Sequence, residues 1–296
     1  MWLEEKGKIN EPLFCKEYVS NCPVIFSDNR FYNVDGEISE DVISHSISEK
    51  VMPHVTNNVA AVVKRLTEAL KLYCFSEPVV PKEDEIHLLN GILKTDGTWL
   101  PEKKFCVNRL NITYNPDIWN GEYYPVNFML FLMEMLDMDD IITLQEYLGY
   151  CLIPTTKAQK MLFLVGKGGE GKSRVGLVMR SILGDNMNTG SIQKVETTPF
   201  ARADLEYKLL MVDDDMDMNA LPKTNYIKSI VTAEAKMDLE HLLVMVDDDM
   251  KLEALPQTNH IKTIVSAELP MDLERKGQQS YQGSLNVRFL VFGNGT

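Results

Sequence analysis

The sequence predicts an α/β fold for residues 156–296, preceded by a smaller, mostly helical α+β domain in residues 1–155. From residue 161 onward, short apolar runs that end in Gly or Asp alternate with helical stretches, which is typical of a mainly parallel sheet covered by helices. Before residue 155, apolar residues recur mostly at helical spacing, between turns that contain Pro or Gly. We therefore expect a domain boundary near residue 155.

The N-terminal part should contain four elements. An apolar stripe at helical spacing predicts a packed helix in residues 56–74. In residues 86–101, one Asn-Gly and one Asp-Gly pair separate short apolar runs, so a small hairpin-like element is expected. Residues 125–137 and 141–153 predict a pair of helices that ends before Pro154.

Charge and composition restrict the class of protein. The net charge is −13, and residues 1–155 hold 13 Lys and Arg against 24 Asp and Glu. This balance argues against a protein that coats nucleic acid through bulk positive charge. It is still compatible with a ring that is acidic outside and has a basic inner channel. Five cysteines without a C-x-x-C pair favour reduced thiols in a cytoplasm. The charged N-terminus lacks the apolar core of a signal peptide, and the longest apolar run, residues 123–133, is too short for a membrane span.

Residues 161–184 carry the strongest functional motif, an apolar strand followed by G-x-x-x-x-G-K-S and a helix. The glycines allow backbone N–H groups to point at phosphates, and the helix N-terminus adds positive potential. Lys172 is expected to neutralise the phosphates of ATP, and the Ser173 hydroxyl to ligate Mg²⁺. The alternative, a Gly-rich turn that happens to contain Lys and Ser, is disfavoured by the order of strand, loop and helix. The expected nucleotide-binding residues are Gly166, Gly168, Gly169, Glu170, Gly171, Lys172 and Ser173.

An acidic strand should complete this site. In "LLMVDDDM" (209–216), the apolar residues predict a buried strand, with aspartates emerging at its carboxyl end. We expect Asp213 to hold Mg²⁺ and Asp214 to polarise the attacking water, while Asp215 is also consistent with a solvated loop. Asn294 ends a further strand (287–294), where an amide can orient the water or sense the γ-phosphate. Gly-Asn-Gly is also an ordinary turn.

The acidic strand occurs twice. Residues 204–237 and 238–271 match at 22 of 34 positions, so Asp247 and Asp248 are alternates to Asp213 and Asp214. Lys172 precedes Asp213 by 41 residues, and Asn294 follows Asp247 by 47. Removing either copy leaves these two intervals, so one unit is a duplication inside an otherwise complete core. The spare strand can lie at a sheet edge, pair with another subunit or stay loosely packed.

Several segments resemble the superfamily 3 helicase domain of phage and plasmid primase-helicases, a group that includes the poxvirus primase-helicase. Residues 144–173 resemble the lead-in and phosphate loop of that family, 204–216 its acidic strand, and 261–277 the segment before its sensor strand. "IHLLNGILKTDGTWLP" (86–101) and "NITYNPDIW" resemble the domain that precedes its ATPase. Lys208 resembles the polar strand entry of the family, which slightly favours the first copy as the functional one.

The resemblance implies an AAA+-like phosphate-loop NTPase core in a hexameric ring that hydrolyses ATP between subunits and draws single-stranded DNA through its channel. It also implies a bacterial host cytoplasm. Lys262, Arg275 and Lys276 are the candidate DNA contacts, although "ERKG" is equally consistent with an exposed charged turn. The priming domain of the family has no counterpart here, and its arginine finger and final core strand are expected beyond Asn294.

Three functions stay open at this point. The first is an ATP-dependent DNA helicase domain of a mobile-element replication protein. The second is a phosphate-loop NTPase that loads or remodels another protein without unwinding DNA. The third is a nucleotide-binding but inactive component of a ring.

Overall fold

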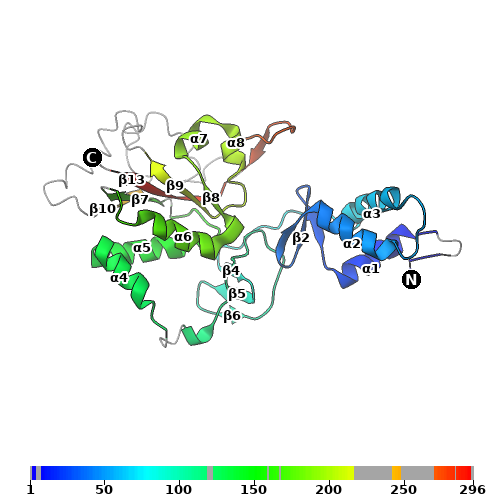
Figure 1. Cartoon of the computed structure of the whole chain (residues 1–296), viewed down its shortest axis with the longest axis horizontal. Coiled ribbons are helices and arrows are strands. Elements are labelled where there is room, and N and C mark those ends of the chain that lie inside the picture. The colour runs from blue at the N-terminus through cyan, green and yellow to red at the C-terminus, as the bar shows by residue number, and fades with distance from the viewer. Residues whose placement is uncertain are drawn as a thin grey trace.

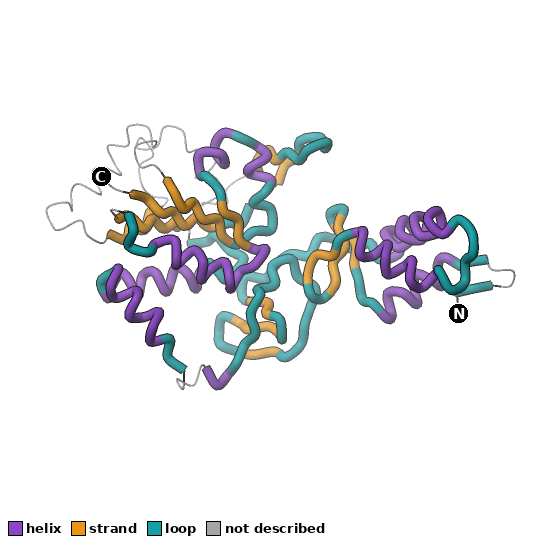
Figure 2. Tube along the Cα trace, in the orientation of Figure 1, coloured by secondary structure: helices purple, strands orange, loops and turns teal. Residues whose placement is uncertain are grey.

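The computed structural model describes residues 2–4, 8–118, 123–158, 160–166, 168–216, 242–247, 270–283 and 285–294. For Asp215, residues 242–247 and Asn294, it describes the backbone only. The chain is elongated, with a helical unit at its N-terminal end, a larger sheet with helices at the other end, and a small strand region between them (Figures 1 and 2). Among the described residues, no helix combines the length and apolar character needed to cross a bilayer.

The N-terminal unit packs three helices against a small antiparallel sheet. Two of these helices are capped by side chains, since Asn10 accepts a hydrogen bond from the Leu13 N–H and Ser39 accepts one from the Val42 N–H. The helix predicted in residues 56–74 is confirmed. These elements are α1 (Glu11–Asn21), β1 (Ile25–Ser27), β2 (Arg30–Asn33), β3 (Gly36–Ile38), α2 (Glu40–Val51) and α3 (Val59–Tyr73). They enclose a core of their own, which includes Phe14, Phe31, Ile43, Ile47, Leu66 and Leu70.

The predicted hairpin-like element is also confirmed, with a third strand added. It consists of β4 (Glu85–Leu88), β5 (Gly91–Lys94) and β6 (Trp99–Leu100), joined antiparallel in that order. Gly91 cannot be replaced here, because a Cβ atom would collide with the Leu100 carbonyl and the Trp99 ring. This requirement explains the glycine of the Asn-Gly pair, which is the first residue of β5.

The predicted helical pair appears as α4 (Val126–Met135) and α5 (Met138–Tyr150). The buried residues of this pair lie in the same hydrophobic core as the large sheet, and the Tyr147 hydroxyl donates to the Phe289 carbonyl at 2.7 Å. Leu88 and Leu110 belong to this core as well. The hydrophobic core therefore does not divide at residue 155, where we expected a boundary, because residues 86–153 pack with the sheet that follows them.

The large sheet establishes the α/β class. Its strand order is β10-β7-β13-β9-β8, and all pairs are parallel except that of β10 with β7. The strands are β7 (Lys160–Gly166), β8 (Met187–Thr189), β9 (Leu210–Met216), β10 (Leu242–Asp247) and β13 (Arg288–Asn294). One face packs on α5 and α6 (Lys172–Leu183). The other face packs on α7 (Ile192–Thr197), α8 (Pro199–Ala203) and the hairpin of β11 (Met271–Leu273) and β12 (Tyr281–Gly283). A 3-10 turn, Gly184–Asn186, links α6 to β8.

The two copies of the duplicated strand occupy different positions. The first copy is β9, which lies inside the sheet between β13 and β8. The second copy is β10, which lies at the outer edge and runs antiparallel to β7. Of the three placements left open for a spare strand, the structure has the one at a sheet edge. This position satisfies the backbone hydrogen bonds of β7 on that side.

His87 in β4 predicts a pH dependence of stability. Burial lowers its pKa, the nearby Arg109 charge lowers it further, and Glu85 opposes both effects. The unfolded chain, with a histidine pKa of about 6.5, therefore binds the proton more readily than the folded chain. The free energy of unfolding should fall as the pH drops below about 6.5, and His87→Asn should make this decrease shallower. Urea titrations at pH 7 and pH 5 measure the free energy of unfolding of the wild type and of His87→Asn. An equal decrease between the two pH values in both proteins would contradict the prediction.

Candidate functional site

The G-x-x-x-x-G-K-S segment forms a tight loop between β7 and α6. β7 ends at Gly166, and α6 begins at Lys172. Gly168, Gly169 and Gly171 have φ values of 100°, 84° and 96°, a region that residues with a Cβ rarely adopt. The backbone therefore requires glycine at these three positions, of which only Gly171 is fixed by the motif.

Lys172 is the charged centre of this loop. Its side chain is only 9% exposed, and its Nζ donates to Oε2 of Glu170 at 2.8 Å. The same Oε2 accepts a hydrogen bond from the Gly168 N–H at 3.0 Å. Ser173 is exposed in the first turn of α6. The loop thus brings together one ammonium group, one backbone donor and one hydroxyl near a helix N-terminus, which is the chemistry of an anion site.

Helix α4 packs directly on the loop. A Cβ atom at Gly171 would come within 2.7 Å of the Phe131 ring. Met135 and Leu136 line a small cavity of about 10 Å³ together with Gly166 and Lys172. The sequence predicted this helix but gave its residues no part in the phosphate site. A signal was available, because α4 is apolar around its circumference, including exposed residues such as Leu130 and Met133.

The strand register places the other predicted residues relative to the loop. Asn294 pairs with Gly166, so it stands level with the start of the loop. Asp213 pairs with Val291, which in turn pairs with Phe163, so Asp213 lies deeper in the sheet. We expected the aspartates to emerge where the strand ends. They are instead part of the strand, because β9 continues to Met216.

A β-bulge interrupts β9 at its aspartates. Val291 pairs with Asp213 and Gly293 with Met216, so Asp214 and Asp215 together stand opposite one residue of β13. Bulges bend a strand and redirect its side chains, and they are common next to active sites. The sequence analysis missed this feature, because three aspartates in a row carry no sign of which one is the extra residue.

Asp213 and Asp214 face opposite sides of the sheet. Asp213 is 6% exposed, and its Oδ2 accepts a hydrogen bond from the Ile192 N–H of α7 at 2.8 Å. Asp214 is exposed. Val212 faces α6, since a Cβ atom at Gly176 would lie 3.6 Å from its side chain. Asp214 lies in the bulge opposite Phe292, which also faces α6, so Asp214 is on the α6 side of the sheet, the side of the phosphate loop.

Asp247, the one described aspartate of the "DDD" run in the second copy, does not lie at the loop end of the sheet. Asp247 pairs with Lys160, at the opposite end of β7 from Gly166. These two ends are about 20 Å apart at the usual strand rise of about 3.3 Å per residue. Asp248 lies outside the described residues. Because β10 runs antiparallel to β7, its carboxyl end lies at the opposite edge of the sheet from the loop. The carboxyl end of β9, the strand of the first copy, lies at the same edge as the loop.

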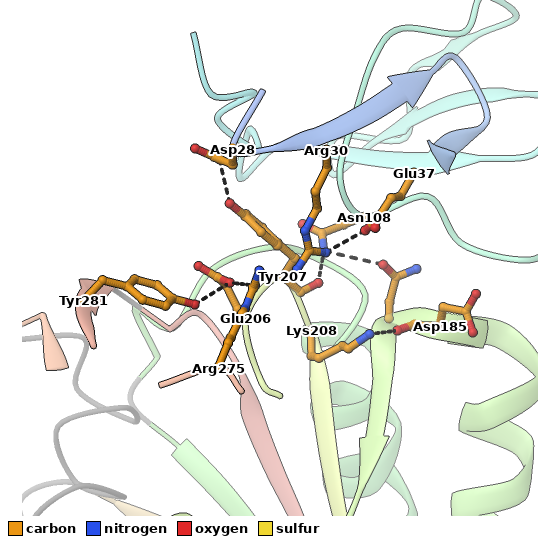
Figure 3. A network of polar contacts seen from close by, with 11 residues as sticks. Asp28, Arg30, Glu37, Asn108, Asp185, Glu206, Tyr207, Lys208, Arg275 and Tyr281 are labelled. Carbon is orange, nitrogen blue, oxygen red and sulfur yellow. Dashed lines mark hydrogen bonds and ion pairs between the residues drawn. The ribbon is translucent and has the colours of Figure 1, made fainter. Parts of the chain in front are cut away.

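Two of the three candidate DNA contacts, Arg275 and Lys276, lie in the described part of the chain. Arg275 forms an ion pair with Glu206 and lies over the Tyr281 ring, with 5.8 Å to its centroid (Figure 3). Lys276 is exposed in the turn between β11 and β12. Lys262 falls outside the part of the chain that the structure describes. A DNA phosphate at Arg275 would have to compete with the Glu206 carboxylate.

A polar network joins the N-terminal unit to the start of β9, as Figure 3 shows. The Tyr207 hydroxyl donates to Asp28 Oδ2 at 2.7 Å, and its carbonyl accepts from Asn108 Nδ2 at 2.5 Å. The Arg30 guanidinium lies 5.7 Å from the centre of the Tyr207 ring. Tyr207 has a φ of 61°, a costly conformation for a residue with a side chain. Burial raises its pKa, and the hydrogen bond to Asp28 raises it further.

Comparisons with known proteins relate the chain to a sequence family and to solved structures. Residues 164–242 match the profile of a family of unknown function, DUF5906. The chain is similar in structure to the apo NrS-1 C-terminal region, with 12% identity and a TM-score of 0.48. That likeness covers 98% of this chain and 58% of the other, so the chain spans less than two thirds of that protein region. No curated protein matched the sequence.

The contrast between the two acids predicts different effects on stability. Asp213→Ala removes the acceptor of the buried Ile192 N–H, so it should lower the free energy of unfolding by about 1–3 kcal/mol. Asp214→Ala, at an exposed position, should change it by less than about 0.5 kcal/mol. Urea unfolding of the three proteins measures both values. Equal destabilisation by the two substitutions would contradict the assignment of Asp213 to the buried face.

Proposed function

We propose that this chain is a phosphate-loop ATPase. The observation that carries the proposal is the loop itself, with three glycines in the left-handed region followed directly by Lys172 at the start of α6. This backbone directs N–H groups into the loop, and the helix start and Lys172 add positive potential. The residues fit a nucleoside triphosphate because its phosphates carry the negative charge that this arrangement favours.

Each residue of the site has a task in this proposal. The loop N–H groups and Lys172 hold the β- and γ-phosphates, and Ser173 ligates Mg²⁺. When bound, Mg²⁺ neutralises charge that develops on the phosphate oxygens. Asp214 is the candidate to polarise water because it lies on the α6 side, whereas Asp213 is buried on the α7 side, where it accepts from the Ile192 N–H. Asn294, level with Gly166, is the candidate to sense the γ-phosphate.

We further propose that ATP hydrolysis drives movement of single-stranded DNA through a hexameric ring in a cytoplasm. Support comes from the resemblance of residues 144–173, 204–216 and 261–277 to superfamily 3 helicases. Lys262 and Lys276 are the preferred DNA contacts, because Arg275 is already paired with Glu206. Lysines of this kind hold the DNA backbone and do not read its bases.

Lys172→Ala tests the ATPase proposal. Loss of the ammonium group should lower ATP turnover by at least about 100-fold, the scale seen when one preorganised charge-stabilising group is removed from an active site. Phosphate release with ATP and Mg²⁺ measures the rate. Lys64→Ala, which removes an exposed lysine from α3, is the matched control and should keep the wild-type rate. Unchanged turnover in Lys172→Ala would exclude this loop as the catalytic site.

Asp214→Asn tests which copy of the acidic strand is functional. It should reduce kcat while ATP still binds, because the substitution removes the water-polarising charge and leaves the phosphate loop intact. Asp248→Asn makes the same change at the equivalent position of the second copy, and we expect normal turnover. The opposite pattern, with loss only in Asp248→Asn, would assign the site to the second copy.

A further inference from the structure

We propose that the Glu170 carboxylate is a built-in anion of the phosphate loop that competes with the nucleotide and sets the affinity of the site. The inference rests on the proposed nucleotide site and adds to it a residue whose charge opposes binding. The sequence places Glu170 among the expected nucleotide-binding residues. Its side chain, however, uses the groups that a phosphate would need.

The contacts of Glu170 are those of a bound phosphate oxygen. One oxygen, Oε2, accepts hydrogen bonds from Lys172 Nζ at 2.8 Å and from the Gly168 N–H at 3.0 Å. The carboxylate lies over the end of β7, where a Cβ atom at Gly166 would come within 2.8 Å of Oε2. The same imagined Cβ atom would lie 2.9 Å from Lys172 Nζ. Carboxylate and ammonium therefore meet directly above the first glycine of the motif.

The space around this ion pair is already filled. The cavity that Glu170 and Lys172 line with Gly166 has a volume of about 10 Å³, at the lower limit of the roughly 10–15 Å³ that a cavity needs to hold a single water molecule. The Lys172 side chain is 9% exposed and that of Glu170 is 19% exposed. A phosphate group cannot enter beside the carboxylate, so Glu170 must move out before the loop closes on a phosphate.

The loop backbone permits this movement. Glu170 stands between Gly169 and Gly171, both in the left-handed region and both without a side chain that hinders rotation. A Cβ atom at Gly169 would meet nothing within 4 Å, so the chain before Glu170 has open space. The carboxylate can therefore swing into solvent without disturbing Lys172, which α6 holds in place.

The ion pair has two physical consequences. It supplies a counter-charge to a nearly buried lysine, which would otherwise be costly to desolvate. It also creates an equilibrium between a form that holds the ion pair and a form that can accept phosphate. Only the second form binds the nucleotide, so the apparent dissociation constant is the intrinsic one divided by the fraction of molecules in that form. A ligand with more phosphate charge displaces the carboxylate more easily, so the pair should favour ATP over AMP.

Glu170→Gln tests the inference, because glutamine can still accept from Gly168 but carries no charge to hold Lys172. Calorimetric titration with ATP and Mg²⁺ should give a dissociation constant about three- to tenfold lower than that of the wild type. The gain should be smaller at high salt, which screens the wild-type ion pair. Glu134→Gln, which removes an exposed acid from α4, is the control for net charge and should bind like the wild type.

The outcomes separate this inference from the proposed function. If the wild type binds ATP, Lys172→Ala does not, and Glu170→Gln binds no tighter than Glu134→Gln, the competing-anion role is overturned while the ATP site stands. If Lys172→Ala binds as the wild type does, the proposed function itself fails. The dissociation constant of Glu170→Ala for ATP is a second test that does not depend on how glutamine packs. Weaker ATP binding in both Glu170 variants would also overturn the inference.

Discussion

The left-handed backbone of Gly168, Gly169 and Gly171 is the constraint on which the site depends. A residue with a side chain would pay about 1–2 kcal/mol in that region, so the tight passage from β7 to α6 requires glycine. The turn places Lys172 at the start of α6 and leaves room for Phe131 against Gly171. Helices α4 and α5 belong with the sheet because their buried residues share its core, and Phe131 of α4 also covers the loop at Gly171.

The duplicated segment shows how position determines the role of a sequence. The two copies share the run "MVDDDM", yet β9 of the first copy lies inside the sheet and β10 of the second copy lies at its edge. Inside the sheet, the parallel register directs β9 toward the loop end, and the bulge at Asp214 and Asp215 gives its acids different surroundings. At the edge, the antiparallel register carries Asp247 to the other end of β7. Composition alone could not distinguish these two copies.

The sequence predicted what depends on local patterns. The helix of α3, the β4–β5 hairpin, the α4–α5 pair and the order of strand, loop and helix around Lys172 follow from periodicity and turn residues. Contacts between distant segments could not be predicted in this way. Tyr207 forms hydrogen bonds with both Asp28 and Asn108, although more than 170 residues of sequence separate it from Asp28. The Glu170–Lys172 pair is local, but an acid inside the motif does not reveal which way its side chain turns.

The burial of a charged side chain, Arg288, is another feature that could not be predicted from the sequence. Arg288 is 1% exposed at the start of β13, where its guanidinium donates to the Tyr150 carbonyl and lies 5.0 Å from the centre of that ring. Burial lowers its pKa, while the same environment, chiefly burial, raises the pKa of Cys151 to about 12. Nothing in "NVRFLVF" distinguishes this buried arginine from an exposed one. Its contacts with α5 bind that helix to the sheet next to the site.

A crystal structure of the chain with a non-hydrolysable ATP analogue and Mg²⁺ tests the proposed site most directly. We expect the β- and γ-phosphates on the loop between Gly166 and Ser173, with Lys172 in contact and the Glu170 carboxylate turned away. The metal should lie on Ser173 and face the aspartates of β9. Phosphates bound elsewhere, or a metal facing Asp247 and Asp248, would contradict this account.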